Sequence, residues 1–130
     1  MAARPQAETP TDGELEILKV LWEHGPSTVR KVLEQLNKTR ARAYTSVMTM
    51  MNLMYDKHLL QREPQGRAFL YRPATAQRAV LSEIVDDLVG KAFDGSASSL
   101  VLALLDKSKL SPEEADKIKD AITEYQSTKS

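Results

Sequence analysis

Apolar residues recur at helical spacing in three short segments of the amino-terminal half of the chain. The first segment can begin with Thr11 or Asp12 as its cap and must stop at the His-Gly-Pro breaker of residues 24–26. The second can begin with Ser27 as its cap, buries one apolar side, and ends at residues 37–38. A third segment follows after a short turn. The pattern therefore predicts three consecutive helices.

The third segment, residues 40–57, has two faces of different chemistry when it is placed on a helix at about 100° per residue. One sector is apolar and holds Tyr44, Val47, Met48, Met51, Met54 and Tyr55. The opposite sector is polar and holds Arg42, Thr45, Ser46, Thr49 and Asn52. Serine and threonine are poor choices for a merely solvated helix face, where Glu, Lys and Gln are expected. Their hydroxyl groups can both donate and accept hydrogen bonds, so this face is suited to reading base edges in DNA.

A hairpin pattern follows the third segment. Two short alternating stretches, residues 59–62 and 68–72, flank a turn at residues 63–67. They predict an antiparallel hairpin with a basic tip, and they place Leu60, Phe69 and Tyr71 toward or beside the core. Three helices followed by such a hairpin is the order of a winged helix-turn-helix, in which the third helix enters the major groove and the hairpin lies along the DNA backbone.

The remaining chain carries apolar stripes that are wider than a lone exposed helix needs. Apolar residues recur between positions 75 and 93, cluster at 100–105, and recur again after the helix start at Ser111-Pro112. Three helices of this length cannot bury these stripes alone, so we expect a second copy of the chain as partner. The predicted dimer contacts are Val80, Leu81, Ile84, Val85, Leu88, Leu100, Val101, Leu104, Ile118 and Ile122.

The fold expected from these patterns is mainly α with a small β-hairpin wing. Residues 1–10 have no periodicity and are predicted to be a disordered lead-in. Residues 11–74 are predicted to form a winged-helix DNA-binding domain, and residues 75–130 a helical dimerisation domain of three helices.

The distribution of charge sharpens this division. The whole chain is neutral, which by itself argues against nucleic-acid binding. Residues 30–72, however, hold nine basic and three acidic side chains, whereas residues 76–130 hold seven basic and ten acidic ones. A basic middle and an acidic tail indicate that one part meets phosphate and that the other does something else.

Candidate DNA contacts follow from the polar helix face and the basic hairpin. Hydroxyl and amide groups of the helix are expected to read bases, and arginines to bind phosphate. Leu53 lies on the same polar face, where contact with a thymine methyl or with the wing would account for it. The predicted DNA-binding residues are Arg40, Arg42, Thr45, Ser46, Thr49, Asn52, Arg62 and Arg67.

Other classes of function find little support in the sequence. The chain has no cysteine, which excludes disulfides and thiolate chemistry, and its two histidines have no partner at metal-ligand spacing. Neither a glycine-rich phosphate loop nor a nucleophile motif is present, so we expect no enzyme, no catalytic residue, no metal and no cofactor. No apolar run approaches the roughly 20 residues that span a bilayer, so we expect a cytoplasmic protein without direct membrane binding.

Several runs of residues resemble one known family in order and spacing. TDGELEILKVLWEHGPSTVRKVLEQL, AYTSVMTMMNLMYDKHLL, GRAFLYRP and SSLVLALLDKSKLSPEEADKIKDAI are similar to the penicillinase repressor family of bacterial regulators, the BlaI and MecI type. The resemblance covers about residues 11–126. It implies a homodimeric repressor that binds a palindromic operator through its winged helix, with the last three helices intertwined between subunits.

The resemblance also implies how repression is relieved. The family is released from DNA by proteolysis in its dimerisation part, after a membrane sensor with a zinc metalloprotease domain detects a β-lactam or other cell-wall stress. By position in the motif, the candidate cleavage bond is Ala103–Leu104, where cleaved relatives carry an Asn-Phe pair. Leu53-Met54 stands where relatives commonly show Arg-Leu, so the operator preference is expected to differ.

Two other readings fit the same elements. In a repressor gated by a small molecule, a ligand would bind between the DNA and dimer domains and shift the melting temperature without cleaving the chain. In a winged-helix module for protein interaction, changes on the polar helix face would leave DNA binding unchanged.

Overall fold

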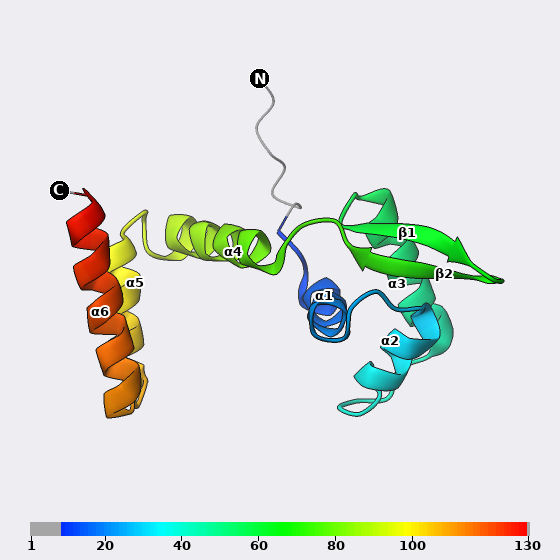
Figure 1. The fold of residues 1–130 in the computed structure, drawn as a ribbon, viewed down its shortest axis with the longest axis horizontal. Helices are drawn as coiled ribbons and strands as arrows, with labels where there is room; N and C mark the ends of the chain where they lie inside the picture. Colours follow the sequence, from blue (N-terminus) through cyan, green and yellow to red (C-terminus); the bar gives the residue numbers. More distant parts are fainter. Residues whose placement is uncertain (1–8, 130) are drawn as a thin grey trace, which may run out of the picture. The chain divides into compact units, whose positions relative to one another are not determined.

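The computed structural model describes residues 9–129, so most of the lead-in expected at residues 1–10 lies outside the described residues. Helices α1 (Asp12–His24), α2 (Val29–Leu36) and α3 (Tyr44–Asp56) are followed by strands β1 (Leu60–Gln65) and β2 (Ala68–Pro73), as Figure 1 shows. Helices α4 (Gln77–Ala92), α5 (Ala97–Lys107) and α6 (Pro112–Lys129) complete the described chain. The expected fold, mainly α with a two-stranded antiparallel wing, is confirmed.

Helix α1 begins at a complete capping box. The Thr11 hydroxyl accepts a hydrogen bond from the Glu14 amide at 3.2 Å, and the Glu14 carboxylate accepts one from the Thr11 amide at 3.0 Å. Two of the four otherwise unpaired amides of the first turn are thereby satisfied. The helix ends at Gly25, whose φ of 82° is strained for residues with a side chain. Both predicted ends of this helix are confirmed.

Helix α2 begins one residue later than predicted. Its cap is Thr28, whose hydroxyl accepts from the amide of Lys31 at 3.2 Å, and not Ser27. Ser27 is buried, and its backbone pairs with Tyr71 of β2 through two hydrogen bonds of 2.9 and 2.8 Å. Because both backbone groups of Ser27 are used by this bridge, the helix cannot start there.

Helix α3 is shorter than the predicted segment 40–57. Residues 40–43 form a loop, in which the amide of Arg42 donates to the Asn37 side chain at 2.8 Å. The predicted register is nevertheless right, because Val47, Met51 and Met54 are all buried on one side of α3. Tyr44 and Tyr55, which were expected on the core face, are 39% and 37% exposed.

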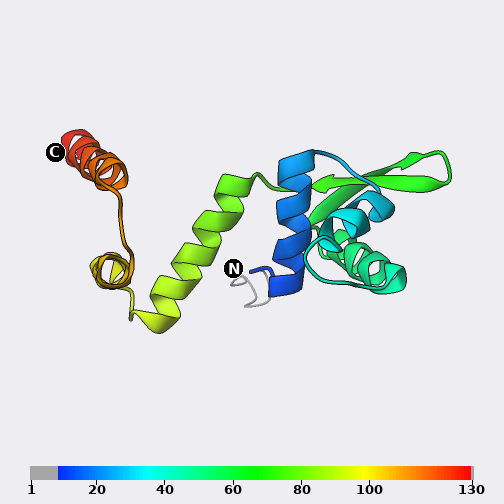
Figure 2. The same cartoon turned by 90° about the horizontal axis from the view of Figure 1, so that it is seen from below.

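Strand β1 runs to Gln65, further toward the tip than the predicted end at residue 62, whereas β2 begins at Ala68 as predicted. Gln65 pairs with Ala68 across a two-residue turn made of Gly66 and Arg67, and Gly66 has a φ of 63°. Such tight turns need residues that tolerate positive φ, which explains how the strands extend so far. At the other end of the hairpin, Leu60 and Tyr71 are each 2% exposed. The hairpin contacts α3 and α1 (Figure 1 and Figure 2).

The core of the winged helix includes a residue that was expected at the dimer interface. The chain divides into two compact units, the first ending at Asp87 and the second beginning at Leu88, whereas the predicted functional domains meet at 74/75. Val80 of α4 is 5% exposed and belongs to the buried cluster of the first unit, and Ile84 packs against that cluster. Val80 is therefore buried within its own chain, which contradicts its predicted place at the dimer interface.

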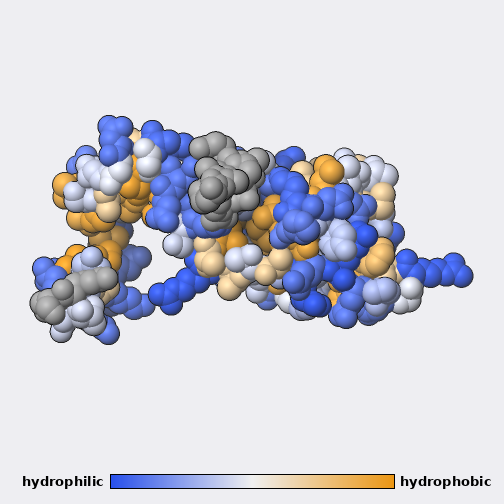
Figure 3. All heavy atoms as spheres, turned by 90° about the horizontal axis from the view of Figure 1, so that it is seen from above, coloured by the Kyte–Doolittle hydropathy of each residue, from blue (hydrophilic) through white to orange (hydrophobic). Residues whose placement is uncertain are grey.

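Helices α4, α5 and α6 expose apolar side chains. No residue of α5 is buried. Figure 3 shows hydrophobic residues gathered on the surface of these helices. The large apolar residues that are at least 38% exposed in α4–α6 are Leu81, Val85, Leu88, Val101, Leu102, Leu104, Leu105, Ile118, Ile122 and Tyr125.

The predicted start of the last helix is also a capping box. The Ser111 hydroxyl accepts from the amide of Glu114 at 3.1 Å, and the Glu114 carboxylate accepts from the amide of Ser111 at 3.0 Å.

Among the described helices, none is by itself long and apolar enough to cross a membrane; α4 and α5 reach that length and composition only as a bent pair.

Candidate nucleic-acid interface

The exposed face of α3 carries the short polar residues that the sequence placed there. Thr45, Ser46 and Thr49 are exposed, and Leu53 lies among them with 54% of its surface accessible. The opposite side of the helix is held by the buried core, so these side chains cannot turn inward. The face therefore offers three hydroxyl groups and one apolar group at helical spacing, a set suited to hydrogen bonds and methyl contacts at base edges.

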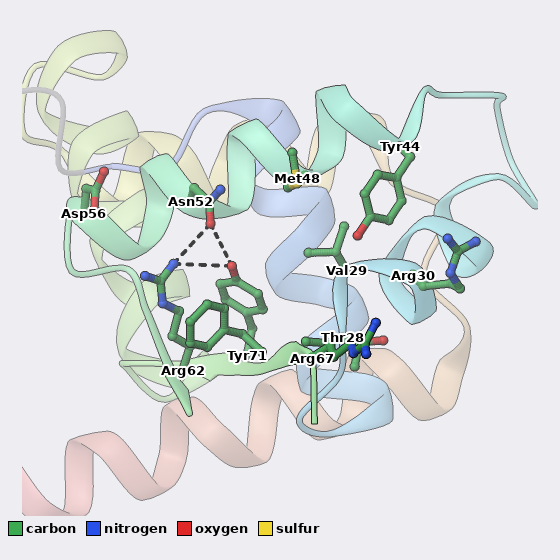
Figure 4. Close-up of a pocket in the computed structure, with 12 residues that line it drawn as sticks. Thr28, Val29, Arg30, Tyr44, Met48, Asn52, Asp56, Arg62, Arg67 and Tyr71 are labelled. Atoms are coloured by element: carbon green, nitrogen blue, oxygen red, sulfur yellow. Dashed lines mark hydrogen bonds between the residues drawn. The ribbon is translucent and has the colours of Figure 1, made fainter. Parts of the chain in front are cut away.

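A groove of about 700 Å³ lies between α3, the start of α2 and the hairpin (Figure 4). Its walls combine aromatic, basic and amide side chains, and its outer end is formed by the exposed Arg67 at the hairpin tip. Asp56 is the one acidic residue on its walls within the described chain. The aromatic, basic and other large side chains that line the groove are Arg30, Tyr44, Met48, Asn52, Arg62, Arg67, Phe69 and Tyr71.

Asn52 is turned from the exposed face toward the hairpin. Its side-chain carbonyl accepts one hydrogen bond from the Arg62 guanidinium at 3.1 Å and another from the Tyr71 hydroxyl at 2.7 Å. Figure 4 shows the amide nitrogen of Asn52 pointing away from both donors. Asn52 thus differs from the three hydroxyl-bearing residues with which it was grouped, because its carbonyl is held by the hairpin.

Arg62 is enclosed by aromatic rings. Its guanidinium carbon lies 3.9 Å from the centre of the Tyr55 ring and 4.2 Å from that of Phe69. At these distances the cation is attracted by the negative faces of both rings. Arg62, which was expected to bind phosphate, is therefore engaged within the protein.

Arg42 is also engaged within the protein. Its side chain is only 10% exposed, and its guanidinium donates to the Glu16 carboxylate at 2.8 Å and to the Leu36 carbonyl at 2.6 Å. These bonds hold the loop before α3 against α1 and the end of α2. Arg40, by contrast, is 68% exposed and lies 3.8 Å from Glu16, so its guanidinium is open to solvent.

Two groove residues were missed by sequence reasoning. The Arg30 guanidinium lies 5.3 Å from the centre of the Tyr44 ring, and both residues are exposed. With Ser27 as the predicted cap, Arg30 stood where a capping box would carry an acid, which was the one signal for it; with Thr28 as the observed cap, that position belongs to Lys31. Tyr44 gave no comparable signal, since its position in the helix period matched the core face.

The surroundings of Glu14 lower the pKa of its carboxyl below the ordinary value. Burial raises the pKa of this carboxyl, but the hydrogen bond from Lys57 at 2.7 Å, the bond from the Thr11 amide and the charge of Lys57 together outweigh burial and lower the pKa below 4.5. Because Lys57 follows α3, this ion pair fixes the end of α3 to the start of α1.

Comparison with known proteins shows to which family the sequence is similar. A family model described as Penicillinase repressor matches residues 10–124. The penicillinase repressor of Bacillus licheniformis is 27% identical over 119 residues, 92% of this chain and 93% of that protein. The transcriptional regulator BlaI of Mycobacterium tuberculosis is 30% identical over 118 residues, 88% of this chain and 84% of the relative. A solution structure of the DNA-binding domain of the repressor BlaI is 31% identical, with a TM-score of 0.49, and covers 59% of this chain and 90% of that one. Since the family model spans most of its length, the chain belongs to the penicillinase repressor family, a family of transcriptional repressors and not of enzymes.

Proposed function

We propose that this chain is a sequence-specific repressor that binds double-stranded DNA through α3 and the hairpin tip. The observation that carries the proposal is the row of Thr45, Ser46, Thr49 and Leu53, exposed on a helix whose other side is held by the core. A helix with this face fits the major groove, where each base pair presents a distinct set of donors and acceptors. The relatives that match the chain are named as repressors and transcriptional regulators, which supports this role.

The arginines whose side chains are exposed to solvent are the ones that we expect to bind DNA phosphates. Arg40 lies just before α3, Arg67 at the hairpin tip and Arg30 at the start of α2, and all three are exposed. Such contacts set the register of the protein on DNA and make its affinity depend on salt. Arg42 and Arg62 contribute indirectly, by holding the loop and the hairpin in place.

A second copy of the chain is the partner that we assign to the apolar surfaces of α4–α6. The supporting observation is that α5 buries none of its residues within its own chain, although Val101, Leu102, Leu104 and Leu105 are all apolar. Two copies would place two α3 helices on one operator. Linking the second half-site contact to the first raises its effective concentration, so the dimer would bind far more tightly than one copy.

Relief of repression is proposed to occur by cleavage at Ala103–Leu104, inside α5. Leu104 is 54% exposed and Ala103 is partly buried, so the bond lies on a helix that has little tertiary packing within its own chain. A protease needs an extended substrate, and a helix of this kind unwinds locally at low cost. Cutting it would remove part of the dimer surface and so lower the affinity for a two-part operator. The proposed antirepressor is a membrane sensor metalloprotease.

The test of DNA recognition uses a short duplex that the wild-type chain selects from a randomised library, measured by gel shift at fixed salt. Thr49→Val keeps the shape of the side chain and removes its hydroxyl, so we expect affinity for the selected duplex to fall about tenfold relative to a scrambled one. Thr75→Val, at an exposed threonine after the hairpin, serves as the matched control and should change nothing.

Two results would count against the proposal. One is a wild-type chain that enriches no sequence from the library. The other is a Thr49→Val chain that keeps the wild-type ratio between selected and scrambled duplexes, since α3 would then not read the bases.

A further inference from the structure

Arg62 and Tyr71 hold Asn52 in one orientation by its carbonyl oxygen. An amide oxygen has two lone pairs, and here one receives the Arg62 guanidinium at 3.1 Å and the other the Tyr71 hydroxyl at 2.7 Å. A guanidinium can only donate. The opposite orientation of the amide would place the amide hydrogens of Asn52 against a cation, so the network selects a single orientation.

The network also connects three elements. Arg62 comes from β1, Tyr71 from β2 and Asn52 from α3. Tyr71 is 2% exposed, and its backbone pairs with the buried Ser27, which precedes α2. The Arg62 guanidinium is stacked between Tyr55 of α3 and Phe69 of β2, so two kinds of attraction tie the hairpin to α3 at the same place.

We propose that Arg62 and Tyr71 are positioning residues that set how α3 reads DNA, and that Asn52 presents only its amide N–H groups to a base. An asparagine that reads adenine uses its oxygen for the N6 amino group and its nitrogen for N7. With both lone pairs of its oxygen occupied, Asn52 cannot make that pair. It can donate to guanine N7 and O6 or to thymine O4; at adenine it can reach only N7 and leaves the N6 amino group without an acceptor. This inference rests on the proposed function, because it concerns base readout.

The first test compares the base preference of two variants that each lose one hydroxyl. Tyr71→Phe frees a lone pair of the Asn52 oxygen, whereas Tyr55→Phe keeps the ring against Arg62 and removes a hydroxyl that makes no hydrogen bond within the described residues. Each chain selects duplexes from the same randomised library. We expect wild type and Tyr55→Phe to discriminate against adenine at one operator position about tenfold, and Tyr71→Phe to lose most of that discrimination.

The second test needs no DNA. Hydrogen exchange of the hairpin amides is measured in the full free chain of wild type, Arg62→Lys and Arg67→Lys. Lysine keeps the charge but loses the planar fork and the stacking. We expect Arg62→Lys to speed exchange at β1 and β2 about tenfold and Arg67→Lys to leave it unchanged, because Arg67 is exposed at the turn.

The two tests separate failure of this inference from failure of the proposed function. If no chain selects a DNA sequence, the proposed function is wrong, and exchange still decides whether Arg62 holds the hairpin. If wild type selects DNA but Tyr71→Phe keeps the same preference at every position, the donor-only role of Asn52 is overturned. Equal exchange in Arg62→Lys and wild type would overturn the positioning role of Arg62.

Discussion

At the scale of single residues, four arginines with the same expected role occupy three kinds of environment. Arg40 and Arg67 are exposed, Arg42 is 10% exposed beside Glu16, and Arg62 is stacked between two rings. A local sequence pattern records the charge of an arginine but not the distant residue that it meets, here a carboxylate 26 positions away. The sequence therefore predicts that these arginines can bind phosphate, but it does not predict which of their guanidinium groups remain exposed to solvent.

These environments predict different responses to salt. Arg67→Gln should remove one phosphate contact, which lowers the slope of log affinity against log salt by about 0.9. Arg42→Gln should leave the slope unchanged and lower the free energy of unfolding by about 2 kcal/mol, because Glu16 and the Leu36 carbonyl lose a charged donor. Titrations at several salt concentrations, together with urea unfolding, measure both quantities. A reduced slope for Arg42→Gln would show that Arg42 reaches phosphate after all.

The lowered pKa of Glu14 makes the free energy of unfolding depend on pH. Since its pKa is lower in the folded chain than the ordinary 4.5, folding favours the ionised form. Its contribution is complete at pH values above 4.5 and is lost as the pH falls through the folded pKa. Glu14→Gln should therefore be less stable near neutrality and lose less stability on acidification than wild type. Urea midpoints between neutral and acidic pH measure this, and Glu34→Gln, at an exposed position, should follow wild type.

At the scale of elements, the positions of helices and strands could be predicted more fully than their ends. The 3.6-residue period of buried Val47, Met51 and Met54 comes from local sequence, and so does the capping box at Thr11. The start of α2 could not be predicted, because it depends on the pairing of Ser27 with Tyr71, which lies far along the chain. Tyr44 was misplaced for a related reason, since Arg30 offers its ring a contact at the surface.

The backbone conformation of the hairpin tip determines which substitutions of Gly66 the turn tolerates. Gly66 has a φ of 63° and nothing within 4 Å of where a Cβ would stand, so a substitution there is limited by the backbone and not by space. Gly66→Asn should be tolerated, whereas Gly66→Val should cost about 1 kcal/mol more, since β-branched residues strongly disfavour positive φ. Thermal unfolding of the two variants measures the difference. Equal stability would mean that the turn changes its geometry.

At the scale of the whole molecule, the chain contains two units that differ in how much of their apolar surface is buried. The unit ending at Asp87 has a closed core, whereas the unit beginning at Leu88 leaves most of its large apolar residues exposed. The sequence showed the apolar stripes of both units, but the stripe of α4 continues across the boundary without a change in period. Its first residues therefore looked like dimer contacts, although Val80 is buried in the first unit. Only the packed structure separates the two roles.

Val80 and Ile122 provide a matched pair that separates folding from association. Val80→Ala removes apolar volume from a filled core and should lower the free energy of unfolding by about 2 kcal/mol while leaving the dimer dissociation constant unchanged. Ile122 is 49% exposed in the single chain, so Ile122→Ala should barely affect folding of the first unit. It should raise the dimer dissociation constant about tenfold if α6 packs on a second copy. Sedimentation equilibrium measures association, and near-ultraviolet circular dichroism follows the winged-helix core through Trp22. The assignment of α6 to the dimer would be wrong if Ile122→Ala associates like wild type.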